Sequence, residues 1–531
     1  LTHTQREREI EKHIHNSRRE GSHGPRSSLG EPLSQPRTSE GKKEKGEEMA
    51  SQGNRPADHL LGELADYVVQ FSASDIPQET LTTARYCLID GVGCMIAALD
   101  FSECTKLLGP VVPGTVVPDG VHVPGTNYEL DPVLGAFNIG ALIRWLDWND
   151  TFLGREWGHP SDNFGAILAV AEFVSKQRQA KGEPPLTMRD VLVAAVKAYE
   201  IQGVMSLGNC FNAEGLDHVI LVRLASTAVV AHLLGCSRDQ VLNAISHVFV
   251  DGGALRCYRH FPNTGSRKSW AAGDATSRAV VHAFNALKGE MGYPTVLTAP
   301  RWGFQTVYMG GKELVLSQPL GHYIMDNILF KASFPAEFHA QTAVECAFAL
   351  HQAVADSLDT IQEIKIWTQE SAVRIIDKIG PLHNPADRDH CLQYMVAVAL
   401  IHGNLKAEYY EDKFAADPRI DALRNKMVVV EERPFSEDYL DPEKRSIANA
   451  ICITLGDGST TERVEVHYPI GHKVRRREGY AAVEAKLASN LKVKFSEMEV
   501  KDLMDLFLNA EAFENLSVPE FMDILVRQDA S

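Results

Sequence analysis

The chain has 531 residues, of which 44% are hydrophobic and 23% are charged. This composition is ordinary for a globular protein, and the length allows two large hydrophobic cores. The net charge of −17 disfavours nucleic acid as a partner, because an acidic surface repels phosphate. The apolar runs are short and interrupted by polar residues, so no membrane-spanning segment is predicted.

Residues 1–48 hold ten Lys/Arg and nine Asp/Glu residues, with almost no large apolar side chains. Such a segment cannot bury enough surface to offset its ordering entropy, so residues 1–56 are predicted to be a disordered extension. It is too acidic for a typical mitochondrial transit peptide and has no secretory signal at its start. The first methionine, Met49, is a candidate natural start.

Helical patterns dominate from about residue 57 to residue 310. Asp75 and Pro77 predict the start of a helix within residues 73–99. Asp131, followed by proline, predicts the start of a helix over residues 133–146, which is apolar nearly all round and should be central. Thr187 and Asp190 resemble a capping box. Further helices are expected over residues 59–71, 163–177, 191–205, 236–250 and 269–287.

The pattern changes in the second half of the chain. Residues 360–371 alternate as a strand does, and residues 449–469 predict a hairpin that turns at Asp457 and Gly458. Helical patterns return after residue 479. The predicted fold is therefore mainly α, with a large all-α domain (residues 57–325), a smaller α+β lid domain (326–468) and C-terminal helices that rejoin the first domain (469–531).

Protonatable groups crowd the stretch from Arg144 to Asn163, between two apolar helices. If the preceding helix continues, Asp147 and Asp150 lie on one of its faces, at the C-terminal end. A carboxylate there should have a raised pKa unless a cation pairs with it. From spacing alone these aspartates are solvated helix breakers. His159 fits equally a helix-entry residue and an acid/base group near neutral pH. Three tryptophans in the stretch favour a dry site.

A basic segment, residues 256–270, stands out in this acidic chain. It contains no acid and five basic residues, interleaved with aromatic ones: Arg256, Arg259, His260, Arg267 and Lys268. A solvated surface patch is the commoner explanation for such a run. The Asn-Thr-Gly turn before a helix favours instead a site for carboxylate or phosphate. No nucleotide-binding glycine motif is present.

Three more histidine-containing segments have structural roles by default. They surround His218, His339 (with Lys331 and Glu337) and His390 (with Arg388 and Tyr394). His390 and Tyr394 share a face if their segment is helical. The nine cysteines are scattered and include no Cys-x-x-Cys pair, which argues against disulfides, thiolate zinc sites and iron–sulfur clusters. Together these features suit a cofactor-free enzyme that acts on a polyanion.

Five of these motifs resemble the MmgE/PrpD family, most closely its 2-methylcitrate dehydratases. They are RWLDWNDTFLGREWGHPSDN, GLDHV, NTGSRKSWAAGDATSRA, FKASFPAEFHAQTAVE and NPADRDHCLQYMVA. The resemblance runs from about residue 58 almost to the C-terminus. It implies a helical domain with an α+β lid, a homodimer, and dehydration of 2-methylcitrate to 2-methyl-cis-aconitate in propionate breakdown, without an iron–sulfur cluster. In a eukaryote it implies the mitochondrial matrix, and otherwise the cytoplasm.

The resemblance also implies site residues, through the active-site positions of the related cis-aconitate decarboxylases. The matching positions are Asp147, Asp150, Thr151, His159, His218, Lys268, Lys331 and Tyr394. The gap from Thr151 to His159 is longer than in the decarboxylases and is similar to the dehydratase branch. The segment after Lys331 is one residue longer than the decarboxylase pattern.

Elimination of water requires a base, an acid, and cations that stabilise the developing charge. We expect Asp147 and His159 to be the acid/base pair, supported by His218 and Tyr394. Asp150, Thr151, Arg259, Arg267, Lys268 and Lys331 are expected to bind the tricarboxylate. The alternatives are an itaconate-forming cis-aconitate decarboxylase, another tricarboxylate hydro-lyase, or an inactive helical binding protein that keeps the fold.

Overall fold

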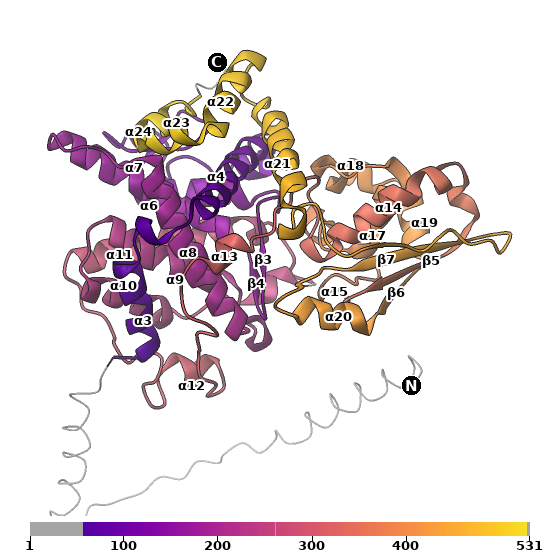
Figure 1. The fold of residues 1–531 in the computed structure, drawn as a ribbon, viewed down its shortest axis with the longest axis horizontal. Coiled ribbons are helices and arrows are strands. Elements are labelled where there is room, and N and C mark those ends of the chain that lie inside the picture. Colours follow the sequence, from indigo (N-terminus) through magenta and orange to yellow (C-terminus); the bar gives the residue numbers. More distant parts are fainter. Residues whose placement is uncertain (1–56, 261, 528–531) are drawn as a thin grey trace, which may run out of the picture. The chain divides into compact units, whose positions relative to one another are not determined.

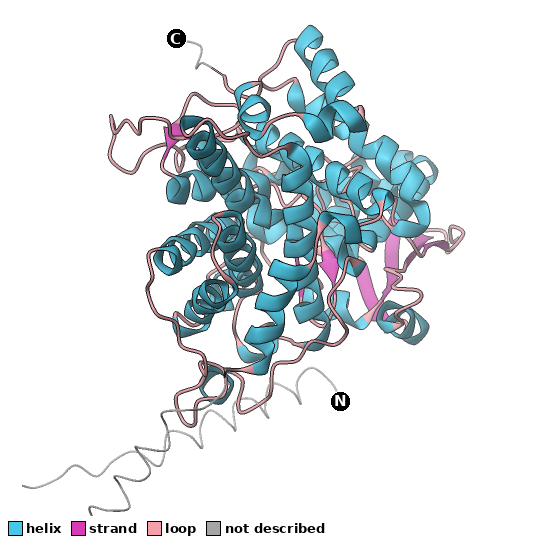
Figure 2. Ribbon diagram, turned by 60° about the vertical axis from the view of Figure 1, so that its left-hand side comes forward, coloured by secondary structure: helices cyan, strands magenta, loops and turns pink. Residues whose placement is uncertain are grey.

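Helices dominate the structure (Figure 2), in agreement with the mainly α prediction. The computed structural model describes residues 57–260 and 262–527, so the extension predicted over residues 1–56 lies outside it. The first hydrophobic core draws on residues between Leu60 and Ala332 and between Val483 and Leu525. Its main helices are α3 (His59–Gln70), α4 (Gln78–Ala98), α6 (Pro132–Arg144), α7 (Phe164–Ala180), α8 (Met188–Gly208), α9 (Val219–Leu233), α10 (Arg238–Val250) and α11 (Arg267–Leu287).

Capping residues set several of these helix ends. The Asp131 side chain accepts from the backbone N–H of Val133 at 2.9 Å, and α6 begins at the proline between them, as predicted. Thr187 and Asp190 form the predicted capping box of α8. The prediction for Asp75 is wrong, because this residue closes a 3₁₀ turn and Pro77 is the N-cap of α4.

Glycines allow the three central helices to approach closely. A Cβ atom on Gly273 of α11 would lie 2.4 Å from the carbonyl oxygen of Phe137 in α6. A Cβ on Gly165 of α7 would lie 2.9 Å from the Cα of Gly140 in α6. Both distances are too short for real contacts, so side chains at these positions would push the helices apart. The helix that follows the basic segment is therefore held tightly against the helix that precedes the Arg144–Asn163 stretch.

The strands of the first part are only two residues long. β1 (Val121–His122) pairs with β2 (Glu129–Leu130), and β3 (Phe152–Leu153) pairs with β4 (Trp157–Gly158), both antiparallel. Short helices connect the larger elements: α5 (Ser102–Thr105), α12 (Phe304–Tyr308) and α13 (Tyr323–Asp326).

A second hydrophobic core lies between Phe334 and Val466. Its four-stranded sheet has the order β6-β5-β7-β8, with β5 parallel to β6 and the other neighbours antiparallel. The strands are β5 (Ile361–Thr368), β6 (Met427–Glu431), β7 (Asn449–Leu455) and β8 (Val464–Val466), which confirms the predicted strand and hairpin. The helices are α14 (Gln341–Val354), α15 (Glu370–Ile375), α16 (Pro385–Arg388), α17 (Leu392–His402), α18 (Asp412–Ala415), α19 (Pro418–Arg424) and α20 (Arg433–Leu440).

The C-terminal helices contribute to the first core. They are α21 (Arg476–Leu491), α22 (Glu497–Leu508), α23 (Ala510–Asn515) and α24 (Val518–Asp523), drawn in yellow in Figure 1. Lys486 of α21 forms an ion pair of 2.7 Å with Asp90 of α4, and both side chains are buried. The two ends of the described chain thus build one core, with the segment of the second core between them.

Two helices, α4 and α8, have the length and composition to cross a membrane. Most residues of both helices are buried inside the fold. Core helices of soluble proteins show the same features, so this observation is weak support for a membrane span.

Candidate active site

Asp147 and Asp150 follow the end of the helix and share no helix face, but both are buried, so the interpretation as solvated helix breakers is wrong. Helix α6 ends at Arg144, and Asp147 adopts a left-handed backbone conformation with φ of 50°. Few residues other than glycine adopt this conformation, which is costly unless the surroundings impose it. The turn directs the two carboxyl groups to different partners.

The Asp147 carboxylate lies at the centre of a buried cluster of charged and imidazole groups. Arg144 Nη1 is 2.5 Å and Lys331 Nζ is 2.9 Å from its Oδ1. His159 Nε2 lies 3.4 Å from the same oxygen, and His390 Nδ1 lies 3.8 Å from Oδ2. We call these five residues, together with Lys268 and Asp389, the junction cluster, because they come from segments of both hydrophobic cores.

A backbone bridge explains how Lys331 reaches Asp147, which lies 184 positions earlier in the sequence. The backbones of Thr151 and Leu329 exchange hydrogen bonds of 2.9 and 3.0 Å, so the chain before Lys331 is fixed beside β3. The Lys331 ammonium then donates to the Asp147 carbonyl oxygen at 2.7 Å as well as to its carboxylate. The long gap between Thr151 and His159 is the hairpin β3–β4, which returns the chain to place His159 in the cluster.

The cations keep Asp147 ionised. Burial acts to raise the pKa of this carboxyl, but the charges of Arg144 and Lys331 outweigh it and hold the pKa well below its usual range. Because cations pair with this carboxylate, the raised pKa expected for an unpaired carboxylate near a helix C-terminus does not occur. An ionised Asp147 has no proton to give, so it is not the acid of the expected acid/base pair.

His159 is a neutral imidazole with a defined tautomer. Burial, with the nearby charge of Arg144 and Lys331, holds its pKa well below the ordinary value. Its Nδ1 lies 2.7 Å from the backbone oxygen of Asp150, which accepts a hydrogen bond only from a protonated nitrogen. The unprotonated nitrogen is therefore Nε2, which faces Asp147, so His159 is equipped to act as a base.

Lys268 joins the cluster from the first turn of α11. Its ammonium donates to Asp389 Oδ1 at 2.5 Å and to His390 Nδ1 at 2.8 Å. Burial lowers the pKa of Lys268 to about 8, against the opposing effect of Asp389. Only 2% of the Lys268 side chain is exposed, so the basic segment is not a solvated surface patch at this position.

Asp217 pairs with Arg259, one of the two arginines of the basic segment that were expected to bind substrate. Arg259 makes a two-pronged ion pair with Asp217, with Nη2 to Oδ1 at 3.1 Å. The neighbouring His218 is 3% exposed, and neither of its ring nitrogens makes a hydrogen bond with the described residues. Its ring centre lies 6.1 Å from that of His159. His218 therefore borders the cluster, while Arg259 is already paired.

Two other predicted residues support the backbone of the site. The Tyr199 hydroxyl donates to Asp150 Oδ2 at 2.6 Å, and the Ser161 N–H donates to Oδ1 at 3.0 Å. Thr151 donates its hydroxyl proton to the Gly158 carbonyl at 2.8 Å, across the hairpin. Asp150 and Thr151 thus position the segment around His159 through buried hydrogen bonds of their own.

The structure does not bring Arg267 or Tyr394 to the junction cluster. Arg267 pairs with Asp274 at 2.9 Å and stacks on Trp270, on a different face of α11 from Lys268. The Tyr394 hydroxyl donates to the Tyr409 carbonyl at 2.6 Å within the second core. Its predicted shared face with His390 is wrong, because α17 begins only at Leu392.

The tryptophans of the stretch contact cations. The Lys486 ammonium lies 4.7 Å from the ring centre of Trp148, and the Arg256 guanidinium lies 5.2 Å from that of Trp157. Trp145 packs against the first core. Two of the three tryptophans that favoured a dry site therefore also contact positively charged side chains through their rings.

Sequence reasoning assigned no catalytic or binding role to Arg144, Asp389 or His390, which all belong to the cluster. Arg144 is the last residue of α6, three positions before Asp147. Asp389 and His390 lie in the turn between α16 and α17. The motif NPADRDHCLQYM contains both Asp389 and His390, but the family resemblance pointed to Tyr394 in this motif.

Asp147, Asp389 and His390 are close enough to hold one metal ion together. Lys331 and Arg144 already contact Asp147, and Lys268 contacts Asp389. These three cations would repel a further positive charge at the same oxygens. The group is better suited to binding an anion.

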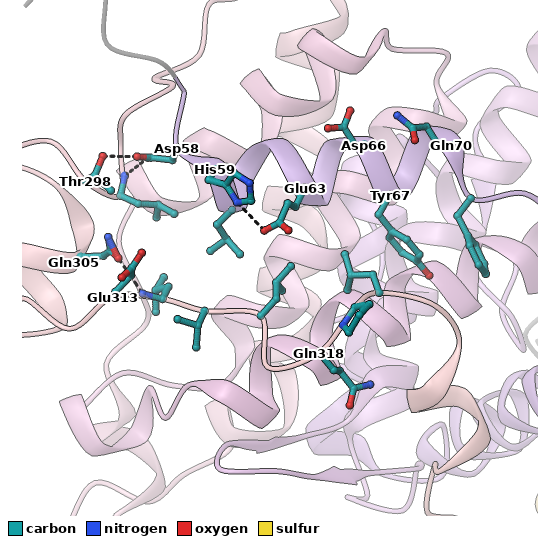
Figure 3. Close-up of a pocket in the computed structure, with 18 residues that line it drawn as sticks. Asp58, His59, Glu63, Asp66, Tyr67, Gln70, Thr298, Gln305, Glu313 and Gln318 are labelled. Carbon is teal, nitrogen blue, oxygen red and sulfur yellow. Dashed lines mark hydrogen bonds and ion pairs between the residues drawn. The ribbon is translucent and has the colours of Figure 1, made fainter.

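A large cavity, drawn in Figure 3, is lined by other residues than those of the junction cluster. It has a volume of about 950 Å³ and is bounded by α3 and the segment around Glu313 and Gln318. Two of its acidic side chains are engaged, since Asp58 accepts from the Leu297 N–H at 2.7 Å and Glu63 pairs with His59 at 3.0 Å. It shares no residue with the junction cluster.

Comparison with known proteins assigns the chain to a family. Residues 62–317 match the MmgE/PrpD N-terminal domain, and residues 334–510 match the MmgE/PrpD C-terminal domain. The chain belongs to the MmgE/PrpD family. The first matched region contributes to the first hydrophobic core, and the second spans the second core together with α21 and α22, which pack in the first core. The junction cluster draws on both matched regions, with Lys331 in the segment between them.

Several relatives in this family carry the name 2-methylcitrate dehydratase. The chain is 55% identical to the one from Cupriavidus necator and 53% identical to the one from Escherichia coli K12, over 88% of this chain and 97% of each relative. A mitochondrial 2-methylcitrate dehydratase from Yarrowia lipolytica is 53% identical over 89% of this chain and 91% of its own length.

Proposed function

We propose that the protein is a 2-methylcitrate dehydratase, a carbon–oxygen lyase that eliminates water from 2-methylcitrate to give 2-methyl-cis-aconitate. The observation that carries this proposal is the junction cluster, which contains three buried cations and a neutral imidazole base. A substrate with three carboxylates needs such cations, and proton abstraction next to a carboxylate needs such a base. The identity of 53–55% to relatives of that name supports the same substrate.

His159 is the base in this proposal. Its Nε2 takes the proton from the carbon next to a substrate carboxylate, and Lys331 and Arg144 stabilise the enolate-like charge that develops. Asp147 holds these two cations in position and remains ionised. Lys268 binds a carboxylate of the substrate.

The runner-up activity is decarboxylation of cis-aconitate to itaconate. The hairpin β3–β4 between Thr151 and His159 is the feature that favours the dehydratase, since the decarboxylase pattern is shorter there. Nuclear magnetic resonance of the products formed from 2-methylcitrate and from cis-aconitate separates the two. The proposal expects 2-methyl-cis-aconitate from the first substrate, and itaconate as the main product of the second would overturn it.

We further propose that the enzyme works without a metal or an iron–sulfur cluster and forms a homodimer. The cations at Asp147 and Asp389 and the absence of Cys-x-x-Cys support the first proposal. The family resemblance supports the second, and light scattering of the purified protein tests it. In a eukaryotic cell we expect the mitochondrial matrix, by analogy with the Yarrowia relative.

A further inference from the structure

His390 has two competing contacts at a single nitrogen. Its Nδ1 lies 2.8 Å from the Lys268 ammonium and 2.9 Å from Asp389 Oδ1. A neutral imidazole nitrogen either accepts or donates a hydrogen bond, so both contacts cannot be hydrogen bonds at once. While Lys268 donates to Nδ1, the ring proton of the neutral imidazole must reside on Nε2.

Removal of Lys268 would reverse this arrangement. Two carboxylates would then face Nδ1, Asp389 at 2.9 Å and Asp147 at 3.8 Å. In the empty site, burial and the charge of Lys268 lower the pKa of His390. Without the ammonium, the nearby negative charges favour the protonated ring. Glu337 is a further acidic group near His390, since the charge of His390 contributes to its lowered pKa.

Binding of the substrate would displace the Lys268 ammonium from His390. Lys268 is the cation that we expect to bind a substrate carboxylate. In the empty site the Asp389 carboxylate pairs with Lys268 in the way that a substrate carboxylate would. The two carboxylates therefore compete for one ammonium. About 19% of the His390 side chain is exposed, so a proton from solvent has access to the ring.

We propose that His390 is the general acid of the reaction, and that the substrate brings about its protonation by drawing Lys268 away from it. This inference rests on the proposed function, because it supplies the acid for the same elimination. Asp389 is a positioning residue that holds Lys268 in the empty site and the His390 imidazolium in the substrate complex. An enzyme arranged in this way protonates its acid only when a carboxylate ligand is bound.

The step balances in atoms and charge. His159 Nε2 takes the proton from carbon, the C–H electrons form the double bond, and the C–O bond breaks. The departing hydroxide takes a proton from the His390 imidazolium and leaves as water. His159 ends protonated and His390 neutral, and proton exchange with solvent restores both. The two rings face different oxygens of Asp147, Oδ1 and Oδ2, so the base and the acid are separate groups held at one carboxylate.

Proton uptake on ligand binding tests the proposal independently of turnover. Tricarballylate is a suitable probe, because it has three carboxylates and no hydroxyl group to eliminate. Titration calorimetry in buffers of different ionisation enthalpy gives the number of protons taken up. Near neutral pH the wild type should take up about one proton per site, and His390→Gln should take up none.

Turnover of 2-methylcitrate provides the second readout. His390→Gln should lose at least ~100-fold in kcat while KM changes by only a few-fold. Asp389→Asn, which keeps the shape of the side chain, should lower both kcat and proton uptake. His467→Gln is the control, because His467 is an exposed histidine that pairs with Glu465 outside the cluster. Unfolding midpoints close to wild type establish that each variant is folded.

Any of three results would overturn the inference. His390→Gln could show unchanged proton uptake, or it could keep a kcat within a few-fold of wild type. The third is that the wild type does not bind tricarballylate. Retained kcat in His390→Gln would make Lys268 the acid instead. Failure of the proposed function has a different signature, because wild-type enzyme would then leave 2-methylcitrate unchanged while still showing His390-dependent proton uptake with tricarballylate.

Discussion

The Nε2 atom of His159 lies 3.4 Å from Oδ1 of Asp147, and it is the unprotonated nitrogen of that ring. A bare imidazole nitrogen beside an ionised carboxylate makes no hydrogen bond to it. The pair is kept in place by Lys331 and Arg144, which contact the carboxylate, and by the Asp150 carbonyl, which accepts from Nδ1. This arrangement leaves Nε2 available to a substrate proton.

His159→Gln is expected to reduce kcat by at least ~100-fold, because it removes the base. KM should change little, since the cations that bind carboxylates are intact. Steady-state kinetics with 2-methylcitrate measure both constants. His402→Gln, in α17 of the second core, serves as the histidine control and should behave as wild type. Activity of His159→Gln within a few-fold of wild type would contradict the assignment.

Lys268→Ala is expected to lose ~100- to 1,000-fold in kcat/KM while the fold survives. The ammonium binds a substrate carboxylate, and alanine leaves that charge without a partner. Arg267→Ala, one position earlier on another face of α11, is the matched control and should cost far less. Similar losses in the two variants would show that the basic segment acts as a diffuse positive patch.

The pH profile of kcat/KM should fall on its alkaline side near pH 8. Burial lowers the pKa of Lys268 to about 8, so the ammonium is present below that pH and is lost above it. A bound carboxylate stabilises the ammonium, so kcat should fall at higher pH than kcat/KM. Lys268→Arg should remove the limb, because a guanidinium keeps its charge throughout this range. An unchanged limb in that variant would assign it to another group.

Gly273→Ala is expected to destabilise the protein by about 1–3 kcal/mol, since its methyl group would overlap α6. Gly62→Ala is the opposite control. A Cβ there meets only the end of the flexible Arg238 side chain at 3.3 Å. Because alanine has the better helix propensity, this substitution should be neutral or stabilising. Denaturant unfolding of the two variants tests this difference in sign.

Lys486→Met is expected to cost about 3–5 kcal/mol, because it leaves Asp90 as an unpaired buried charge. It also removes the hydrogen bonds that Lys486 donates to the carbonyl oxygens of Trp148 and Lys331, at 2.6 and 3.1 Å. Activity should therefore fall together with stability. Lys312→Met, which breaks an exposed ion pair with Glu214, should leave the unfolding midpoint unchanged.

Local features of the sequence predicted much of the fold. Asp131 and the Thr187–Asp190 box begin helices because side-chain capping is a short-range effect, and the turn at Asp457 and Gly458 closes its hairpin for the same reason. Asp75 was misplaced because a 3₁₀ turn and a helix start have the same local pattern.

The site was less predictable, because it depends on long-range contacts. The family resemblance brought Asp147, His159, Lys268 and Lys331 together, and the structure places all four in the cluster. Asp389 was not singled out and His390 was given a structural role by default, because both lie in a turn, where periodicity gives no direction to a side chain. Tyr394 was predicted from the family resemblance, but its hydroxyl donates to the Tyr409 carbonyl within the second core rather than to a group of the cluster.

The most direct test of the account is the dehydration of 2-methylcitrate by the purified protein with and without a strong metal chelator. Ultraviolet absorbance of the conjugated double bond reports the product. The account predicts the same rate in both conditions, because imidazole and ammonium groups carry the chemistry. No dehydration in either condition, or activity that disappears with the chelator and returns with added metal, would contradict it.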